Sequence, residues 1–510
     1  MLKKLILLLC SISAVHAQDS LRYSIDLTKL KKDRLTVEVQ LPVGVKEFCF
    51  PKMVPGTYAI YHFGRYVSNL QAFDQNGKSL LVVRKDTNTF AFKNASSLSY
   101  EVDDTWDSPE IKGTYIFEPA GTNFQKDTLF ALNTHALLGY IKGREQIPVS
   151  LQLKTSKGLV ASSSIMSKDG KYVASSYQKL TDAPILVAPA DTVHLRVANA
   201  DILISVYSPN KKIKASEVAE QLTPLLKAQL NYLGGTFPVE NYAFLIVMSA
   251  HLKNGSYGAL EHAQSSFYYL PEDSIKVMGP VIQDVSAHEF FHIQTPLNLH
   301  SKEIGSFDFQ NPQMSKHLWL YEGLTEYAAN HMQLQGGIIS LTEFLERMTE
   351  KYRTSHFSFD NSIPFTKMSK GVLAKYKEEY GNVYQKGALI GLCLDLYLRN
   401  ETKGRYGTQQ LIRDLSARFG PAKSFDDDAL FQLISETSQV KGIKKFLALY
   451  VSGSKDLPLK ELLPTIGCEL RSSDEKKEKE AILAAMKQEL KEVKNPSPSQ
   501  LDLRKAWIYN

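Results

Sequence analysis

The chain has 510 residues, of which 43% are hydrophobic and 22% are charged. That length is too great for one compact core and suggests roughly three domains, while the composition excludes a disordered or fibrous protein. Sixty Lys and Arg residues face 54 Asp and Glu, a net charge of +6. This excess is too small and too dispersed for nucleic-acid binding, which normally shows clustered basic residues.

Residues 1–17 have the pattern of a secretory signal peptide. Lys3 and Lys4 precede an apolar stretch at 5–12, and the small-residue pattern at 15–17 is typical of a cleavage site. No later stretch reaches about 18 uninterrupted apolar residues. We therefore expect an exported protein, periplasmic or extracellular, with no stable membrane span.

The N-terminal region, residues 18–200, reads as β structure. Short stretches that alternate apolar and polar residues, such as 35–41 and 149–153, are separated by turns rich in Gly, Asn, Asp and Pro. This period of two predicts antiparallel strands and a β-sandwich-like domain. After removal of the expected signal peptide, which contains Cys10, the cysteines are Cys49 in this region and Cys393 and Cys468 later. This odd number, without CxxC spacing, allows at most one disulfide and otherwise predicts three buried thiols.

The pattern of apolar and polar residues changes after residue 200. Apolar residues at three- and four-residue spacing predict a helix over 215–234, a short apolar run predicts a buried strand over 243–248, and helices dominate from about residue 280. A C-terminal helical region is expected over 401–510, and its last part, 473–494, reads as a highly charged helix. The fold class is thus multidomain α+β.

The motif that carries chemistry is His288-Glu289-Phe290-Phe291-His292, an HExxH sequence. On a helix, residues four apart lie on the same face, so both imidazoles can bind one Zn²⁺ ion. Glu289 then lies beside them, where it can take a proton from water. The motif specifies the spacing of these residues as well as their types. We therefore interpret it as a zinc site.

A catalytic zinc needs a third protein ligand and an open position for water. Glu322 comes 30 residues after His292, in a segment that begins apolar at 318 and continues as a helix to about 332. That separation is long enough for the chain to loop back to the first helix. Glu326, one turn further on, is a rival ligand or a partner of a ligand.

These residues resemble a known family. The sequence HEFFH followed by LWLYEGLTEY is similar to the gluzincin zinc peptidases, and most similar to the glycyl aminopeptidase family. The resemblance extends over about residues 22–470. Four other segments carry it, with P-G-x-Y, F-x-R-x-V, G-x-L-E-H and Tyr-x-x-G-A-L patterns: 51–58, 63–67, 257–262 and 383–389.

The resemblance implies a thermolysin-like catalytic domain over 201–400 and a role for each matching residue. His288, His292 and Glu322 would bind one zinc ion, with Glu289 as general base. Glu261 would hold the α-ammonium group of the substrate, and Tyr384 would donate a hydrogen bond to the oxyanion. Many relatives also end in a PDZ-like module; only about 40 residues follow Cys468, so we expect none here.

We therefore expect an exported zinc metallopeptidase, specifically an aminopeptidase acting on peptides with a free N-terminus. One alternative is a zinc endopeptidase of the same fold, because the metal motif does not distinguish the two. The other is a non-catalytic binding protein, which would have no chemical need for Glu289. The sequence leaves open the preferred N-terminal residue and the oligomeric state.

Overall fold

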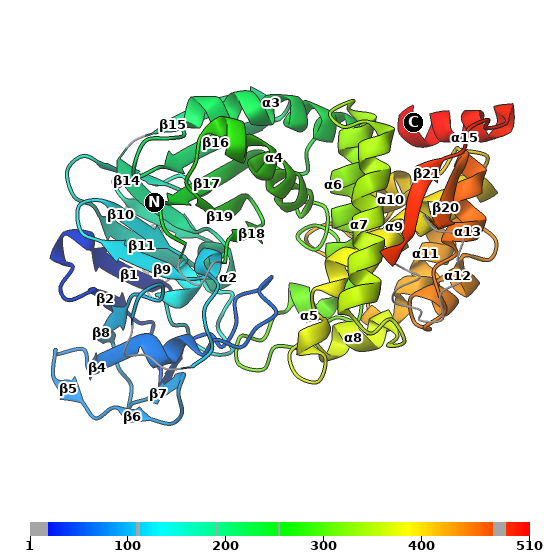
Figure 1. The fold of residues 1–510 in the computed structure, drawn as a ribbon. Coiled ribbons are helices and arrows are strands. Elements are labelled where there is room, and N and C mark those ends of the chain that lie inside the picture. The colour runs from blue at the N-terminus through cyan, green and yellow to red at the C-terminus, as the bar shows by residue number, and fades with distance from the viewer. Residues whose placement is uncertain (1–18, 109–112, 190, 253–255, 473–485, 510) are drawn as a thin grey trace, which may run out of the picture.

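The computed structural model describes residues 19–108, 113–189, 191–252, 256–472 and 486–509. The expected signal peptide lies outside these ranges. Sheets occupy the N-terminal half of the chain and helices the C-terminal half (Figure 1). This arrangement confirms the multidomain α+β fold class. No helix in the described ranges is both long and apolar enough to cross a membrane.

A seven-stranded sheet, with the order β13-β11-β1-β2-β8-β4-β5, forms the base of the N-terminal half. In β2 the burial alternates residue by residue, with Leu35, Val37 and Val39 in the core, as expected for a sheet with one solvated face. Its strands are β1 (Leu21–Asp26), β2 (Arg34–Gln40), β4 (Val67–Phe73), β5 (Ser79–Leu80), β8 (Ser97–Asp103), β11 (Val149–Lys154) and β13 (Lys171–Ala174).

Two smaller sheets complete this β region. One has four strands in the order β12-β14-β10-β9 and the other three in the order β3-β7-β6. Their strands are β3 (Glu47–Cys49), β6 (Val83–Arg84), β7 (Thr89–Ala91), β9 (Thr122–Gln125), β10 (Leu129–Leu132), β12 (Leu159–Ser162) and β14 (Ile185–Pro189), and the short helix α2 (Tyr177–Thr181) precedes β14.

A five-stranded sheet, β15-β16-β17-β19-β18, links the two halves. One of its faces packs on α3 and α4, and the other packs on β10 and β14, so β17 is buried on both sides. The elements are β15 (Thr192–Val197), β16 (Ala200–Tyr207), α3 (Ala215–Tyr232), β17 (Asn241–Ser249), β18 (Gly258–His262), β19 (Ser265–Pro271) and α4 (Ile275–Phe291). β15 lies before the expected domain boundary at residue 200, and it pairs with β16, which begins there. The domain ranges expected from the sequence stay predictions.

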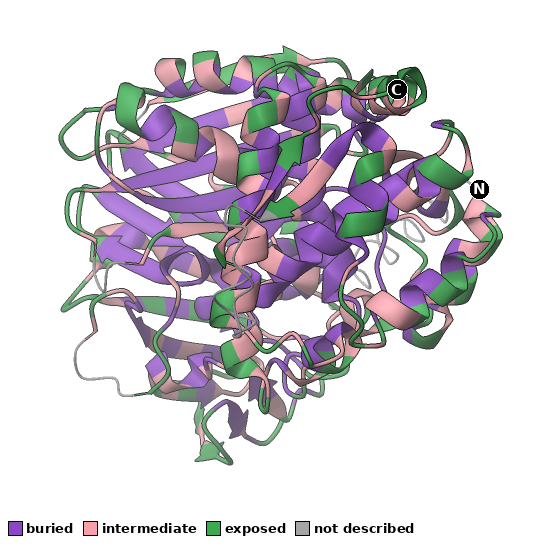
Figure 2. Cartoon of the chain, turned by 45° about the vertical axis from the view of Figure 1, so that its right-hand side comes forward, coloured by how far each residue is buried: buried purple, intermediate pink, exposed green. Residues whose placement is uncertain are grey.

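The helical half is built around α9, which is buried along most of its length. Figure 2 colours each described residue by its burial. A single π-helical turn, η6 (Trp319–Gly323), continues into α6, and both pack against α9. The helices are α5 (Lys302–Gly305), α6 (Leu324–Gln335), α7 (Leu341–Ser358), α8 (Phe365–Gly371), α9 (Asn382–Glu401), α10 (Thr408–Arg418), α11 (Leu430–Ser438), α12 (Ile443–Tyr450), α13 (Leu459–Leu462) and α15 (Pro498–Tyr509).

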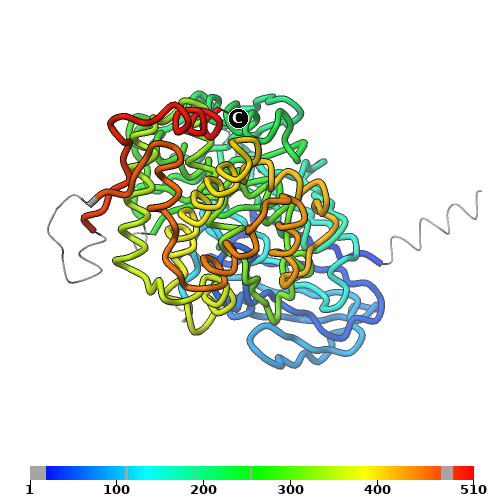
Figure 3. Tube along the Cα trace, turned by 90° about the vertical axis from the view of Figure 1, so that its right-hand side faces the viewer, coloured from blue at the N-terminus to red at the C-terminus, as the bar shows by residue number. Residues whose placement is uncertain are grey.

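Near the C-terminus (Figure 3), α13 and α15 pack on α9, whereas β21 packs on α7. The expected charged helix over 473–494 is wrong where it can be compared, because β21 (Gln488–Glu492) is a strand paired with β20 (Cys468–Ser472). Leu490 is buried between exposed or half-buried neighbours, which is the alternation of a strand. The first part of the expected helix lies outside the described residues. Cys49, Cys393 and Cys468 are free and buried. This agrees with the expectation of three buried thiols and not with that of one disulfide.

Candidate metal centre

The two histidines of the HExxH motif lie one turn apart at the end of α4. Their Nε2 atoms are 3.1 Å apart. Each Nδ1 atom has an acceptor of its own, Glu326 Oε2 at 2.7 Å from His288 and Thr295 O at 3.0 Å from His292. An Nδ1 that donates in this way leaves the Nε2 lone pair of a neutral imidazole free for a metal.

Glu322 supplies the third ligand from the π-helical turn η6. Its Oε2 atom lies 3.4 Å from His288 Nε2 and 3.7 Å from His292 Nε2. One ligand atom from each residue fits within 4.8 Å of the others, and all three residues are buried. Two imidazoles and one carboxylate are a set that zinc prefers in catalytic sites. The residues present therefore fit a zinc ion, as the sequence predicts.

The carboxylate of Glu289 lies beside the same site, within 4.8 Å of a ligand atom of His292. Its Oε2 atom is buried and has no hydrogen-bond partner among the described residues. Burial, opposed by His288, raises the pKa of Glu289 to about 7. A carboxylate in this position can accept and return a proton near neutral pH.

Glu261 lies on β18, at the edge of the five-stranded sheet, and its carboxylate lies within 4.8 Å of ligand atoms of Glu289 and His292. Burial and the nearby Glu322 and Glu289 raise the pKa of Glu261 well above its usual range. A carboxyl group held among other carboxylates gains stability from a cation. The site therefore favours a cationic group beside Glu261.

Tyr384 comes from the first turn of α9, and its ring centre is 5.6 Å from that of His288. Its hydroxyl is 2.5 Å from the hydroxyl of Tyr380. Burial raises the pKa of Tyr384 well above 10, so the phenol keeps its proton and can donate a hydrogen bond. All six residues singled out from the sequence thus surround one site.

Two glycines allow α9 to come this close. A Cβ atom on Gly323 would lie 2.5 Å from the Cα atom of Gly387, and one on Gly387 would lie 2.7 Å from the Cα atom of Gly323. These distances leave no room for any side chain. Gly323 directly follows Glu322, and Gly387 lies three residues after Tyr384. The close contact of these two glycines therefore sets the separation between the ligand and the tyrosine.

Sequence reasoning assigned no role to three other residues at the site. Tyr58, from the N-terminal β region, donates a hydrogen bond to Glu322 Oε1 at 2.7 Å, and its ring packs at a tilt on that of Tyr380, with 4.9 Å between the ring centres. Lys351 on α7 pairs with Glu326 at 2.6 Å. Tyr58 belongs to the P-G-x-Y segment that carries the resemblance, and this was the only feature of the sequence that pointed to it. Neither Tyr380 nor Lys351 stands at a spacing that points to the metal.

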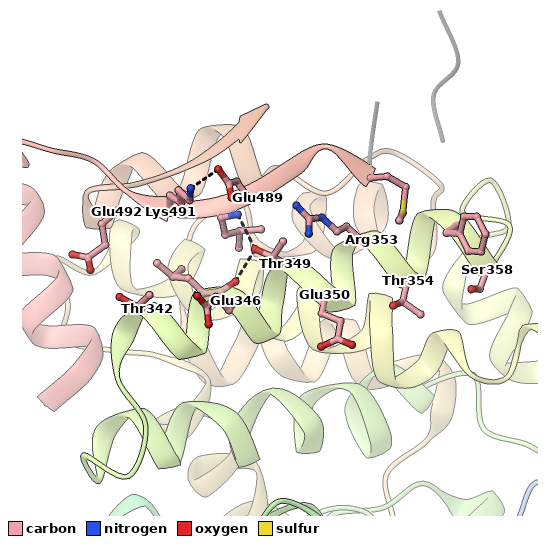
Figure 4. Close-up of a pocket in the computed structure, with 14 residues that line it drawn as sticks. Thr342, Glu346, Thr349, Glu350, Arg353, Thr354, Ser358, Glu489, Lys491 and Glu492 are labelled. Atoms are coloured by element: carbon pink, nitrogen blue, oxygen red, sulfur yellow. Dashed lines mark hydrogen bonds and ion pairs between the residues drawn. The ribbon is translucent and has the colours of Figure 1, made fainter. Parts of the chain in front are cut away.

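Glu326, Asp395 and His262 each contact a neighbouring side chain. Glu326 contacts a ligand and is not one itself. Asp395 pairs with Arg399 at 3.3 Å inside the helical half, and His262 contacts Asp182 at 3.0 Å. A groove of about 770 Å³ between α7 and β21 (Figure 4) is lined by scattered charged and apolar side chains, none of them histidine. It lies away from the metal residues and offers no such chemistry.

Comparison with known proteins agrees with this geometry. The chain matches the Peptidase M61 N-terminal domain over residues 22–189 and the M61 glycyl aminopeptidase family over residues 282–390. No curated protein matches it.

Solved structures show the same fold. An aminopeptidase N family protein from Idiomarina loihiensis is 20% identical, with a TM-score of 0.77 over 89% of this chain and 79% of that one. A mutant M1 zinc metallopeptidase from Deinococcus radiodurans, bound to a Tyr-Ser-Ala substrate, is 15% identical, with a TM-score of 0.52 over 86% and 95%. Yeast LTA4 hydrolase in complex with bestatin is 12% identical, with a TM-score of 0.53 over 88% and 69%.

Proposed function

Because the chain belongs to the M61 glycyl aminopeptidase family of zinc metallopeptidases, we propose that it removes single residues from peptides that have a free N-terminus. The observation that carries this proposal is the position of Glu261 beside the converging His288, His292 and Glu322. The three ligands would hold one zinc ion. A carboxylate fixed beside them selects a cationic N-terminus and sets its distance to the scissile bond.

Glu289, Tyr384 and Glu261 each act at a different point of the proposed reaction. His288, His292 and Glu322 would hold a zinc ion, which when bound would lower the pKa of water and polarise a carbonyl group. Glu289 takes the proton from the attacking water and passes it to the leaving amine, which its free Oε2 atom allows. The protonated Tyr384 donates a hydrogen bond to the oxyanion that forms. Glu261 meanwhile holds the α-ammonium group of the substrate in place.

The core of the proposal is tested by metal analysis and by Glu289→Gln. We expect about one equivalent of zinc in both the wild type and the variant, and a loss of kcat of about 10²–10⁴-fold in the variant. A variant that keeps zinc but loses turnover separates the proton-transfer role from metal binding. Zinc below about half an equivalent in the wild type, or full activity in Glu289→Gln, would overturn the assignment.

Glu261→Gln separates the aminopeptidase from an endopeptidase of the same fold. The wild type should cleave a peptide with a free N-terminus and leave its N-acetylated form intact, since acetylation removes the charge that Glu261 binds. The variant should lose activity on the free peptide chiefly through KM. Equal cleavage of both forms by the wild type would favour the endopeptidase.

We also propose that the protein is exported. The support is the sequence pattern of residues 1–17, with its two lysines, apolar stretch and small-residue cleavage site. Expression of the full chain in a bacterial host, followed by fractionation and N-terminal sequencing, tests this. We expect a mature chain that starts at Gln18 outside the cytoplasm; an intact N-terminus in the cytoplasm would refute export.

A further inference from the structure

Tyr380 and Tyr384 bring two phenol groups together at the start of α9. They are four residues apart, and the backbone of Tyr380 and of Gly381, which precedes α9, is right-handed helical, with φ of −54° and −55°. The helical turn therefore extends back from α9 to Tyr380, and side chains four residues apart on such a turn lie on the same side. The two hydroxyl oxygens are 2.5 Å apart, within hydrogen-bond distance.

The hydroxyl group of Tyr380 meets no other described hydrogen-bond partner than that of Tyr384, and the reverse also holds. The Tyr380 ring is held by packing. Its centre is 4.9 Å from that of the Tyr58 ring and 5.6 Å from that of the Tyr384 ring. Tyr58 is itself tied to Glu322 by a hydrogen bond of 2.7 Å. The ring of Tyr380 is thus anchored, and its hydroxyl group is directed at Tyr384.

The number of protons limits how the pair can be arranged. A phenol has one proton to donate, and its oxygen can also accept. Burial raises the pKa of both tyrosines well above its ordinary value, so both protons are present. If Tyr384 donated to Tyr380, it would have no proton left for an oxyanion. If Tyr380 donates to Tyr384, the proton of Tyr384 stays available.

From this geometry, and resting on the aminopeptidase function proposed above, we propose that Tyr380 is a positioning residue for the oxyanion donor. Its hydroxyl group donates to the oxygen of Tyr384 and so turns the proton of Tyr384 towards the oxyanion. Both protons stay on their own oxygens throughout. A donor is useful to a transition state when its direction is set before the charge develops, and a hydroxyl group that accepts a hydrogen bond also becomes a stronger donor.

Tyr380→Phe tests this, because it removes the hydroxyl group and keeps the ring that packs on Tyr58. With Ala-p-nitroanilide as substrate, we expect kcat about tenfold lower, since a hydrogen bond that acts in the transition state is lost. KM should change by less than about twofold, and the zinc content should not change. Tyr397→Phe is the control. It lies on the same helix, its hydroxyl group donates to Lys441 O at 3.0 Å, and its loss should leave both constants unchanged.

A double variant shows whether Tyr380 acts through Tyr384. Tyr384→Phe alone should lower kcat about 10²–10³-fold, as loss of an oxyanion donor does. Tyr380→Phe should then have no further effect, so the double variant should match Tyr384→Phe. A tyrosine that only supported the fold would lower kcat by the same factor with or without Tyr384. Losses that multiply would therefore overturn the proposal.

Binding of a transition-state analogue gives a readout without turnover. In a phosphinic dipeptide analogue with a free amino group, a tetrahedral phosphorus atom carries an oxygen where the oxyanion would form, so tight binding requires the same donor. The inhibition constant should rise about tenfold in Tyr380→Phe and stay at the wild-type value in Tyr397→Phe. Equal inhibition of the wild type and Tyr380→Phe would contradict the positioning role.

The outcomes separate this inference from the function on which it rests. Wild-type kcat in a folded, zinc-loaded Tyr380→Phe protein, or a change in KM alone, would overturn the positioning role and leave the aminopeptidase intact. Should the phenylalanine variant not fold, Tyr380→Leu removes the same hydroxyl group and should lose at least as much kcat. A zinc-loaded wild type that hydrolyses neither Gly- nor Ala-p-nitroanilide would count against the aminopeptidase function and against this inference with it.

Discussion

The hydroxyl group of Tyr58 donates a hydrogen bond to Oε1 of Glu322 at 2.7 Å, although the two residues are 264 positions apart in the sequence. Tyr58 belongs to the N-terminal β region, and Glu322 is a metal ligand in the helical half. Burial raises the pKa of Tyr58 well above 10, so the hydroxyl keeps its proton. The N-terminal region thus orients one carboxylate oxygen and leaves the other for zinc.

Tyr58→Phe should weaken zinc binding without removing it. The substitution keeps the ring that packs on Tyr380 and deletes only the hydroxyl group, so Glu322 loses a hydrogen bond that orients it. Loss of a hydrogen bond that orients a ligand typically costs about 10–100-fold in metal affinity. Competition with a chelator measures this. Tyr61→Phe, a buried tyrosine that packs on Phe63, is the control, and an equal effect of both variants would contradict the assigned role.

Gly387→Ala should lower kcat more than it lowers zinc affinity. The added methyl group would lie 2.7 Å from the Cα atom of Gly323, so α9 must move away from η6. Tyr384, three residues before Gly387 on α9, would move with it, and an oxyanion donor displaced in this way costs about 10²–10³-fold in kcat. Single-turnover rates and zinc content are measured together. Unchanged kcat in the alanine variant would show that the close approach is not needed.

The sequence predicts the metal centre well because most of its geometry is local. His288, Glu289 and His292 follow from helical spacing alone, and Glu322 from the need for a third ligand and from the motif around it. The role of Tyr58 could not be predicted, because its contact with Glu322 joins two segments that lie 264 positions apart in the sequence. The segment 488–492 was misread for a similar reason. Its many charges resemble a solvated helix, whereas Leu490 pairs with Leu470 in a strand.

His135 should make the stability of the protein depend on pH. Its pKa is about 3 in the folded protein and 6.5 ordinarily, so between these values the unfolded chain binds a proton that the folded chain does not. The free energy of unfolding should therefore fall as the pH drops below about 6.5, by up to about 1.4 kcal/mol per pH unit from this residue. In His135→Leu the slope should be shallower by about one proton.

Urea unfolding at several pH values between about 4.5 and 7 gives this slope. His194→Leu, which changes an exposed histidine on β15, is the matched control and should leave the slope unchanged. An identical slope in the wild type and in His135→Leu would mean that His135 is protonated in the folded protein.

Trp507→Ala should destabilise the helical half. Trp507 on α15 is fully buried, its Nε1–H donates to the hydroxyl of Tyr327 at 2.9 Å, and its ring stacks on His331 at 5.2 Å. Truncating a buried tryptophan costs about 3–5 kcal/mol, and the hydroxyl of Tyr327 loses its donor as well. Tyr509→Ala, on the same helix but 72% exposed, should change the free energy of unfolding by less than about 0.5 kcal/mol. Urea unfolding of both variants measures the difference, and equal losses would mean that α15 is not held by its tryptophan.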